Sequence, residues 1–143
     1  MTQMIFVNLP VANLKASRAF YEAIGAVNEP KFTDDNGACM VISDSIFVML
    51  LTHDFFKTFT DKQIPDATKT CQVLLCISRD SREAVDTIAE QAIAAGGRET
   101  REPQDMGGMM YSRSFEDPDG HVWEPMWMDP AAAEQGTSAF EGA

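Results

Sequence analysis

The sequence predicts an α+β fold built from two similar β-α-β-β-β modules. Strand-like runs alternate with two segments of helical periodicity, and both halves of the chain show the same order of elements. The chain has 143 residues, of which 45% are hydrophobic, which is enough for one domain with its own core. We therefore expect a single domain over residues 1–130.

The first module is expected at residues 4–52. It begins with Met4 to Val11, an apolar, β-favouring run that Pro10 restricts to a strand end or a sheet edge. Asn13 can cap a helix in which apolar residues recur at helical spacing until Gly25 ends it. Three strands follow, at residues 30–33, 39–42 and 46–51.

The second module, at residues 70–129, repeats this order. A strand is expected from Cys71 to Ile77, and a helix from Ser81 to Ala95 ends at a pair of glycines. Three further strands follow, at residues 99–101, 109–116 and 121–128. The linker at 53–69 is expected to begin with a short helix, and residues 131–143 are expected to form a flexible tail.

The charge balance argues against two classes of partner. There are 22 acidic and 11 basic residues, so the net charge of −11 repels nucleic-acid phosphates and anionic lipid head groups. No apolar run approaches the ~18–20 residues of a membrane-spanning helix. The N-terminus lacks the basic region of a signal peptide, so we expect no membrane partner and a cytoplasmic location.

The three cysteines do not suggest a metal or redox site. Cys39, Cys71 and Cys76 are spaced neither like zinc ligands nor like a redox pair. Each lies in an apolar, strand-like run. We therefore expect buried thiols.

Two motifs lie at the ends of the predicted repeat. The first module opens with VNLPVANLKASRAFYEAIGA, and the second ends with FEDPDGHVWEPMW. Together, in this order, they resemble the vicinal oxygen chelate superfamily of glyoxalases, extradiol dioxygenases and bleomycin-resistance proteins. The resemblance spans Met4 to Asp129. It implies that the two modules form an open, barrel-like curved sheet around a small-molecule pocket, with the helices outside. It also implies a homodimer, which exposed strand edges at Met4 to Leu9 and Cys71 to Ile77 would favour.

In metalloenzymes of that superfamily about four side chains, typically histidine, glutamine and glutamate, hold one Zn, Ni, Fe or Mn ion. Here Glu124 matches the family's glutamate and is the candidate metal ligand and catalytic residue. Two of the other matched positions carry poor or uncommon ligands: Phe6 or Asn8 on the first strand, and Met49 on the last strand of the first module. The remaining position carries Gln72 or, in another register, Leu74. The resemblance therefore implies either a pocket without a cofactor or a shell that His53 or a partner subunit completes.

The last hairpin offers Glu124 another partner. A two- or four-residue turn centred on Pro118-Asp119 would place Arg113 opposite Glu124, on the same face as Tyr111. Arg113 would then bind the carboxylate and occupy lone pairs that a metal needs. The pair is either a structural ion pair or part of a site in which Arg113 anchors an anionic or carbonyl ligand and Glu124 is a general base. Trp123 would lie on the opposite face and pack against the helices or a partner subunit.

The same construction in the first module pairs Met40 with Met49, which would make one pocket wall apolar and sulfur-rich. The sequence thus predicts a glyoxalase/bleomycin-resistance-like protein that binds a small organic ligand without a cofactor. The alternative is a metal-dependent lyase, isomerase or dioxygenase of the glyoxalase type. The candidate ligand-binding residues are Arg113, Tyr111, Asn8, Phe6, Met49 and Gln72.

Overall fold

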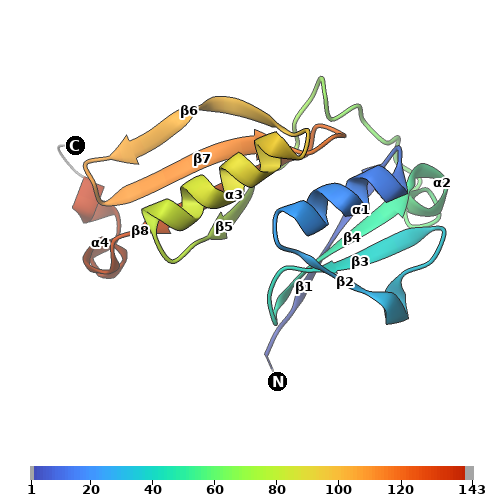
Figure 1. Ribbon diagram of the computed structural model, residues 1–143, viewed down its shortest axis with the longest axis horizontal. Helices are drawn as coiled ribbons and strands as arrows, with labels where there is room; N and C mark the ends of the chain where they lie inside the picture. Colours follow the sequence, from blue (N-terminus) through green and yellow to red (C-terminus); the bar gives the residue numbers. More distant parts are fainter. Residues whose placement is uncertain (1, 141–143) are drawn as a thin grey trace. The chain divides into compact units, whose positions relative to one another are not determined.

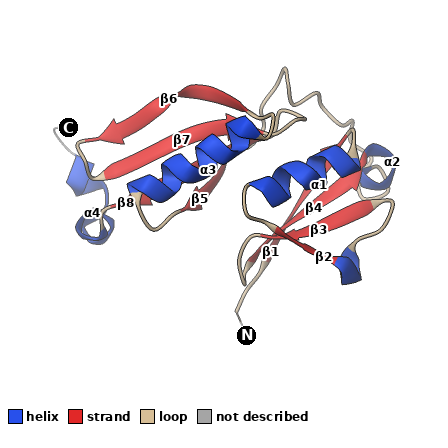
Figure 2. Ribbon diagram, in the orientation of Figure 1, coloured by secondary structure: helices blue, strands red, loops and turns tan. Residues whose placement is uncertain are grey.

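The chain forms two β-α-β-β-β modules in the computed structural model, which describes residues 2–140 (Figure 1). Each module contains one four-stranded mixed sheet, and one main helix lies along each sheet (Figure 2). The first compact unit runs to Thr70 and also includes Pro118–His121. The second contains Cys71–Asp117 and the residues from Val122 onward. The predicted α+β class and the repeated order of elements are confirmed.

The first unit has the sheet order β1-β4-β3-β2, in which β1 runs parallel to β4 and the other pairs are antiparallel. Asn13 caps the first helix as expected, because its side chain accepts a hydrogen bond from the Ala16 amide at 3.0 Å. The elements are β1 (Ile5–Val11), α1 (Leu14–Ala23), β2 (Val27–Glu29), η1 (Pro30–Phe32), β3 (Gly37–Val41), β4 (Ile46–Thr52) and α2 (His53–Phe56).

Side-chain alternation divides the first sheet into a face that α1 covers and an opposite face. Leu9, Val48 and Leu50 are buried on the side of α1, which itself buries Phe20 and Tyr21. The neighbouring positions of β1 and β4 point the other way. The core of this unit therefore lies between α1 and its sheet.

One predicted strand of the first unit is wrong. Residues 30–33 were expected to be extended, but Pro30–Phe32 form a short 3-10 helix and the strand precedes it at Val27–Glu29. Pro30 occupies the first turn of that helix, where its fixed φ fits and its missing N–H leaves no hydrogen bond unmade.

The second unit has the sheet order β5-β8-β7-β6, with β5 parallel to β8. Ser81 caps α3 by accepting from the Ala84 amide at 3.0 Å. Trp123 is buried on the face that contacts α3, as the sequence predicted. The elements are β5 (Leu75–Ser78), α3 (Arg82–Ala94), β6 (Arg98–Met106), β7 (Met110–Glu116), β8 (Val122–Met128), α4 (Pro130–Gln135) and η2 (Gly136–Phe140).

Several boundaries differ from the expected ones. β5 is shorter than expected, and β6 extends well beyond the predicted residues 99–101. The short helix expected in the linker is α2, whereas a helix, α4, begins the segment that was expected to be a flexible tail. None of the helices within residues 2–140 is long and apolar enough to cross a membrane.

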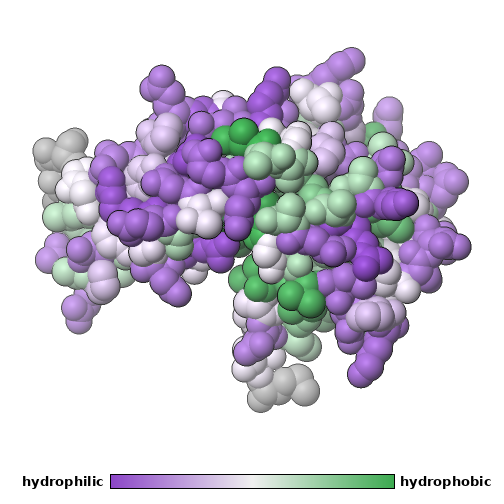
Figure 3. All heavy atoms as spheres, viewed as in Figure 1, coloured by the Kyte–Doolittle hydropathy of each residue, from purple (hydrophilic) through white to green (hydrophobic). Residues whose placement is uncertain are grey.

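The character of the surface and the burial of the three cysteines bear on two expectations from the sequence. The face of the molecule in Figure 3 consists largely of hydrophilic side chains, in keeping with the net charge of −11. Cys39 is buried as expected, but the expectation was wrong for Cys71 and Cys76, which are exposed. Cys71 lies before β5 begins, and Cys76 lies on an edge strand of its sheet, so neither is enclosed.

Candidate functional site

The pairing of β7 with β8 decides which side chains accompany Glu124. Phe115 pairs with Trp123, which puts Ser114 level with Glu124. The predicted pair of Arg113 and Glu124 is therefore wrong by one position. A slip of one residue moves a side chain to the other face of the sheet, because successive residues of a strand point in opposite directions.

The cause is the length of the β7–β8 loop. β7 ends at Glu116 and β8 begins at Val122, so five residues connect the strands, and not two or four. Residues Pro118–His121 pack within the first unit. There, Asp119 Oδ1 accepts a hydrogen bond from the Ala12 amide at 2.8 Å, and His121 Nε2 lies 2.8 Å from the Pro10 carbonyl oxygen, to which it can only donate. These contacts fix a wider turn than the sequence motif suggested.

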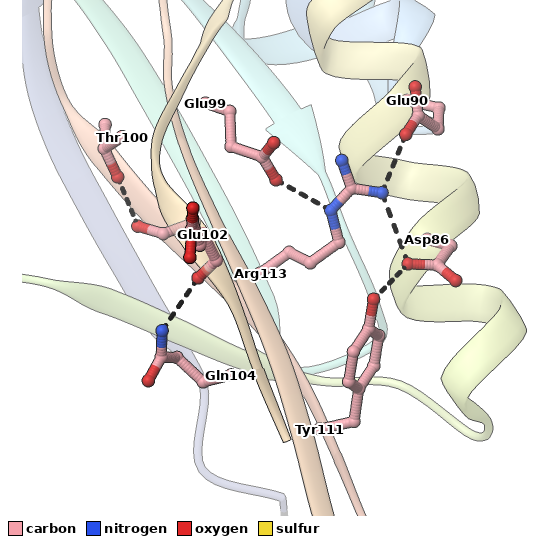
Figure 4. Close-up of polar contacts among 9 residues, drawn as sticks. Asp86, Glu90, Glu99, Thr100, Glu102, Gln104, Tyr111 and Arg113 are labelled. Carbon is pink, nitrogen blue, oxygen red and sulfur yellow. Dashed lines mark hydrogen bonds and ion pairs between the residues drawn. The ribbon is translucent and has the colours of Figure 1, made fainter.

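Arg113 lies on the face that α3 covers, and only 9% of its side chain is exposed. Its Nε donates to Glu99 at 2.8 Å, and its Nη1 donates to Glu90 at 2.8 Å and to Asp86 at 3.2 Å (Figure 4). The hydrogen bond to Glu99 and those to the other two carboxylates raise the pKa of Arg113 above its ordinary value, against the effect of burial. Arg113 thus joins β7 to α3 and to β6.

Tyr111 shares this face with Arg113, as predicted, but the face is the one that packs on α3. Its hydroxyl donates to Asp86 at 2.6 Å, and the guanidinium of Arg82 lies 4.5 Å from its ring centroid. Arg82 in turn donates to Asp105 at 2.7 Å. Tyr111 and Arg113 therefore belong to a polar network on the helix side of the sheet and do not lie beside Glu124.

Asp105 is expected to titrate below the ordinary range of an aspartate. Hydrogen bonds from Arg82 and from the Gly108 amide lower its pKa. A carboxyl group with a lowered folded-state pKa stabilises the fold above its unfolded pKa, and that contribution disappears as the pH falls through the folded pKa. NMR titration of the carboxyl carbons should give a lower midpoint for Asp105 in the parent than in Arg82→Gln. Equal midpoints would contradict the assignment to Arg82.

Glu124 lies in one row of residues on the opposite, helix-free face. Cys76 on β5 is its register partner, and Ser114 lies level with it on β7. Arg101 pairs with Ser114 from β6, and its Nη2 reaches to 3.7 Å from Glu124 Oε2. Thr100 donates to the Ser114 hydroxyl at 2.6 Å. Glu124 is 17% exposed and has an arginine partner that the sequence reasoning missed.

The pKa of the Cys76 thiol depends in part on the charge of Glu124. Partial burial, and secondly the neighbouring carboxylate, raise the pKa of Cys76. We expect Glu124→Gln to lower this pKa and to speed alkylation by iodoacetamide at pH 8 about two- to fivefold, since the thiolate is the reacting form. The rates are compared in a Cys71→Ser background by mass spectrometry. Glu22→Gln, which removes the same charge from α1, serves as the control, and equal rates in all variants would refute the coupling.

The corresponding row of the first unit differs in chemistry. Asn8 pairs with Met49, and Met49 pairs with Cys39. The predicted pair of Met40 and Met49 is wrong by one position, since Met40 lies on the helix side of the sheet and is fully buried. This row therefore contains an amide, a thioether and a thiol.

Phe6 lies on the same face, opposite α1, two residues before Asn8, as the sequence predicted. Its ring stacks on Phe47 with centroids 4.7 Å apart and an interplanar angle of 12°. Phe6 is 49% exposed. The first unit thus presents an aromatic and sulfur-containing surface next to the polar side chain of Asn8.

Several of the positions matched to the superfamily's metal site carry side chains that bind divalent cations poorly. Within residues 2–140, no three histidine, cysteine, aspartate or glutamate side chains are grouped so that they could hold a metal ion. The guanidinium of Arg101 lies beside Glu124, where it would compete with a divalent cation for the carboxylate. Met49 is a poor ligand for such an ion, and Gln72 lies in an exposed segment before β5.

Comparison with known proteins agrees with the fold. The model of the Glyoxalase/Bleomycin resistance protein/Dioxygenase superfamily matches residues 65–124. No curated protein matches the chain. A hypothetical protein from S. aureus has a similar structure, with 26% identity and a TM-score of 0.73 over 89% of this chain and 95% of that chain.

Two further solved structures share the fold at lower identity. A glyoxalase/bleomycin resistance protein/dioxygenase family enzyme from Burkholderia phytofirmans PsJN has 19% identity and a TM-score of 0.75 over 89% of this chain and 99% of that one. A bleomycin resistance determinant encoded on the transposon Tn5 has 19% identity and a TM-score of 0.62 over 89% and 98%. The family match over residues 65–124 and the shared fold agree with the superfamily resemblance that the motifs indicated.

Proposed function

We propose that the chain binds a small organic ligand and that Glu124 is the central polar residue of its site. One observation carries the proposal: Arg101, Ser114, Glu124 and Cys76 form a row of polar side chains on the sheet face opposite α3. Small-molecule sites commonly combine a few fixed polar groups with a larger apolar surface. The bleomycin resistance determinant with this fold is named for a small molecule, which makes that use of the scaffold plausible.

The row offers complementary groups to a ligand. Arg101 can donate to a carbonyl or carboxylate oxygen, whereas Glu124 can accept from a hydroxyl or an N–H group. Arg113 and Tyr111 are not part of this proposal, because both are hydrogen-bonded on the α3 side of their sheet.

Ligand screening of matched variants tests the proposal. Organic acids and heteroaromatic compounds are screened by ligand-observed NMR against the parent, Glu124→Gln, Arg101→Gln and Arg98→Gln. Arg98 also lies on β6 and also pairs with a glutamate, but it is 74% exposed, so its variant controls for the loss of one positive charge. We expect Glu124→Gln and Arg101→Gln to lose at least about tenfold in affinity, since each removes a charged hydrogen bond. Equal affinity in all four proteins would refute the site.

Catalysis at Glu124 is the second candidate. Its carboxylate could take a proton from a bound ligand, or it could hold a divalent metal in a lyase, isomerase or dioxygenase of the glyoxalase type. The match of Glu124 to the family's glutamate favours this alternative. Metal analysis after addition of Zn, Ni, Fe or Mn separates the two: one bound ion per chain that Glu124→Gln abolishes would replace the cofactor-free proposal.

We further propose that the chain forms a homodimer and that it is cytoplasmic. β1 and β5 are the edge strands of their sheets, and apolar side chains are exposed along or beside both of them, including Ile5, Phe6 and Leu74. Exposed apolar edges are commonly covered by another chain. Light scattering after size-exclusion chromatography should give twice the chain mass for the parent and a lower mass for Ile5→Lys. A monomeric parent would contradict this part.

A further inference from the structure

A hollow of about 500 Å³ opens beside α2 in the first unit. His53 begins this short helix, Lys57 follows its end, and Thr60 and Lys62 come from the loop that continues toward β5. All four side chains line the hollow. None of them belongs to the row around Glu124.

The hollow holds positive charge that the protein does not neutralise. Five of the arginines form ion pairs, but neither Lys57 nor Lys62 has an acidic partner within 4.0 Å among the described residues. Asp61 is the one carboxylate in the described lining. In a chain with a net charge of −11, a hollow lined by two lysines and one aspartate is a local exception.

The backbone that carries these lysines is fixed by local hydrogen bonds. Thr52 caps α2, the Lys57 amide donates to the His53 carbonyl at 3.0 Å, and the Lys62 amide donates to the Thr60 hydroxyl at 3.2 Å. The rings of Phe55 and Phe59 meet edge to face with centroids 5.1 Å apart. A ligand would therefore have to order only the side chains, which lowers the entropic cost of binding.

A second hollow, of about 430 Å³, shares His53 and Ile64 with the first. Its lining contains Pro10, Pro65 and Pro118. It also contains two aspartates, which disfavour a second anionic group there. The pair of hollows is thus cationic at one end, and is apolar with hydrogen-bond acceptors at the other.

We propose that the two hollows form a second binding site, for a small organic anion. A phosphate or carboxylate group lies between Lys57 and Lys62, and an uncharged, hydroxyl-bearing part extends past His53 toward Ile64. Ammonium groups bind phosphate and carboxylate oxygens through charge-assisted hydrogen bonds. The proposal does not depend on the ligand proposed for Glu124, because the two sites share no residue.

The test is a ¹H–¹⁵N NMR titration of the whole chain at constant ionic strength, since screening would otherwise change during the titration. The probes are glycerol 3-phosphate, glycerate and, as the uncharged control, glycerol. Saturable shifts at the amides of residues 53–64 are expected with at least one anion and not with glycerol. The anion that binds more tightly identifies the preferred acid group. Absence of saturable shifts with both anions would overturn the proposal.

Matched double variants separate the hollow from net charge. Lys57→Gln/Lys62→Gln is expected to weaken binding at least about tenfold, because both charge-assisted contacts are lost. Lys15→Gln/Lys31→Gln removes the same charge from α1 and η1 and should change the affinity less than about twofold. Equal losses in the two double variants would show binding to net charge alone and would also overturn the proposal.

Discussion

Gly120→Ala is expected to lower the free energy of unfolding by about 3 kcal/mol, through both backbone strain and a steric clash. Gly120 has a φ of +95°, a conformation that L-residues avoid. A Cβ at this position would lie 2.6 Å from the Ala67 carbonyl oxygen and 2.7 Å from the Thr68 nitrogen. Both contacts are to backbone, so relief requires the turn or the linker to move.

Gly96→Ala is the matched control for this experiment. Gly96 has nearly the same φ, +99°, but nothing lies within 4 Å of the added Cβ. Its substitution should cost only the strain of the left-handed conformation, about 1–2 kcal/mol. Urea denaturation followed by circular dichroism gives both values. Equal losses in the two variants would mean that the contact between the turn and residues 67–68 contributes nothing.

The contact of Gly120 with residues 67–68 also shows why some parts of the site could be predicted from the sequence and others could not. Alternation within one strand depends only on the sequence of that strand, so the placement of Trp123 opposite Glu124 was correct. The register between two strands depends on the loop that joins them. The Asp-Pro-Asp-Gly motif predicts a turn, but the contacts with Pro10, Ala12 and Ala67 that lengthen it to five residues come from distant parts of the chain.

Arg101 was missed for a related physical reason. It lies in β6, whose sequence RETREPQDM has no apolar alternation and contains a proline. This edge strand is held by its pairing with β7, and the register shifts after Glu99 and again after Arg101. No periodic signal therefore marks the strand. Residues 99–101 were predicted as a short strand, but nothing in this polar segment indicated that Arg101 would pair with Ser114 and reach Glu124.

Arg113→Ala is expected to lower the free energy of unfolding by about 2–4 kcal/mol. The buried guanidinium is the shared partner of Asp86, Glu90 and Glu99, and its removal leaves three carboxylates close together around an empty space. The estimate lies below the full cost of an orphaned buried charge, because Asp86 and Glu90 are 49% and 65% exposed and water can solvate them. Arg98→Ala, at an exposed pair, should cost less than about 1 kcal/mol.

Two further measurements decide between the structural and the ligand-binding role of Arg113. Repulsion among the three carboxylates is screened by salt, so 1 M NaCl should restore part of the stability of Arg113→Ala and much less of that of Arg98→Ala. Arg113→Lys keeps the charge but not the planar fork that reaches Glu99 and Glu90 at once, so it should recover only part of the loss. If Arg113 instead anchored a ligand, its variants would unfold like the parent and lose affinity in the screen, and the network on α3 would contribute little to the stability of this module.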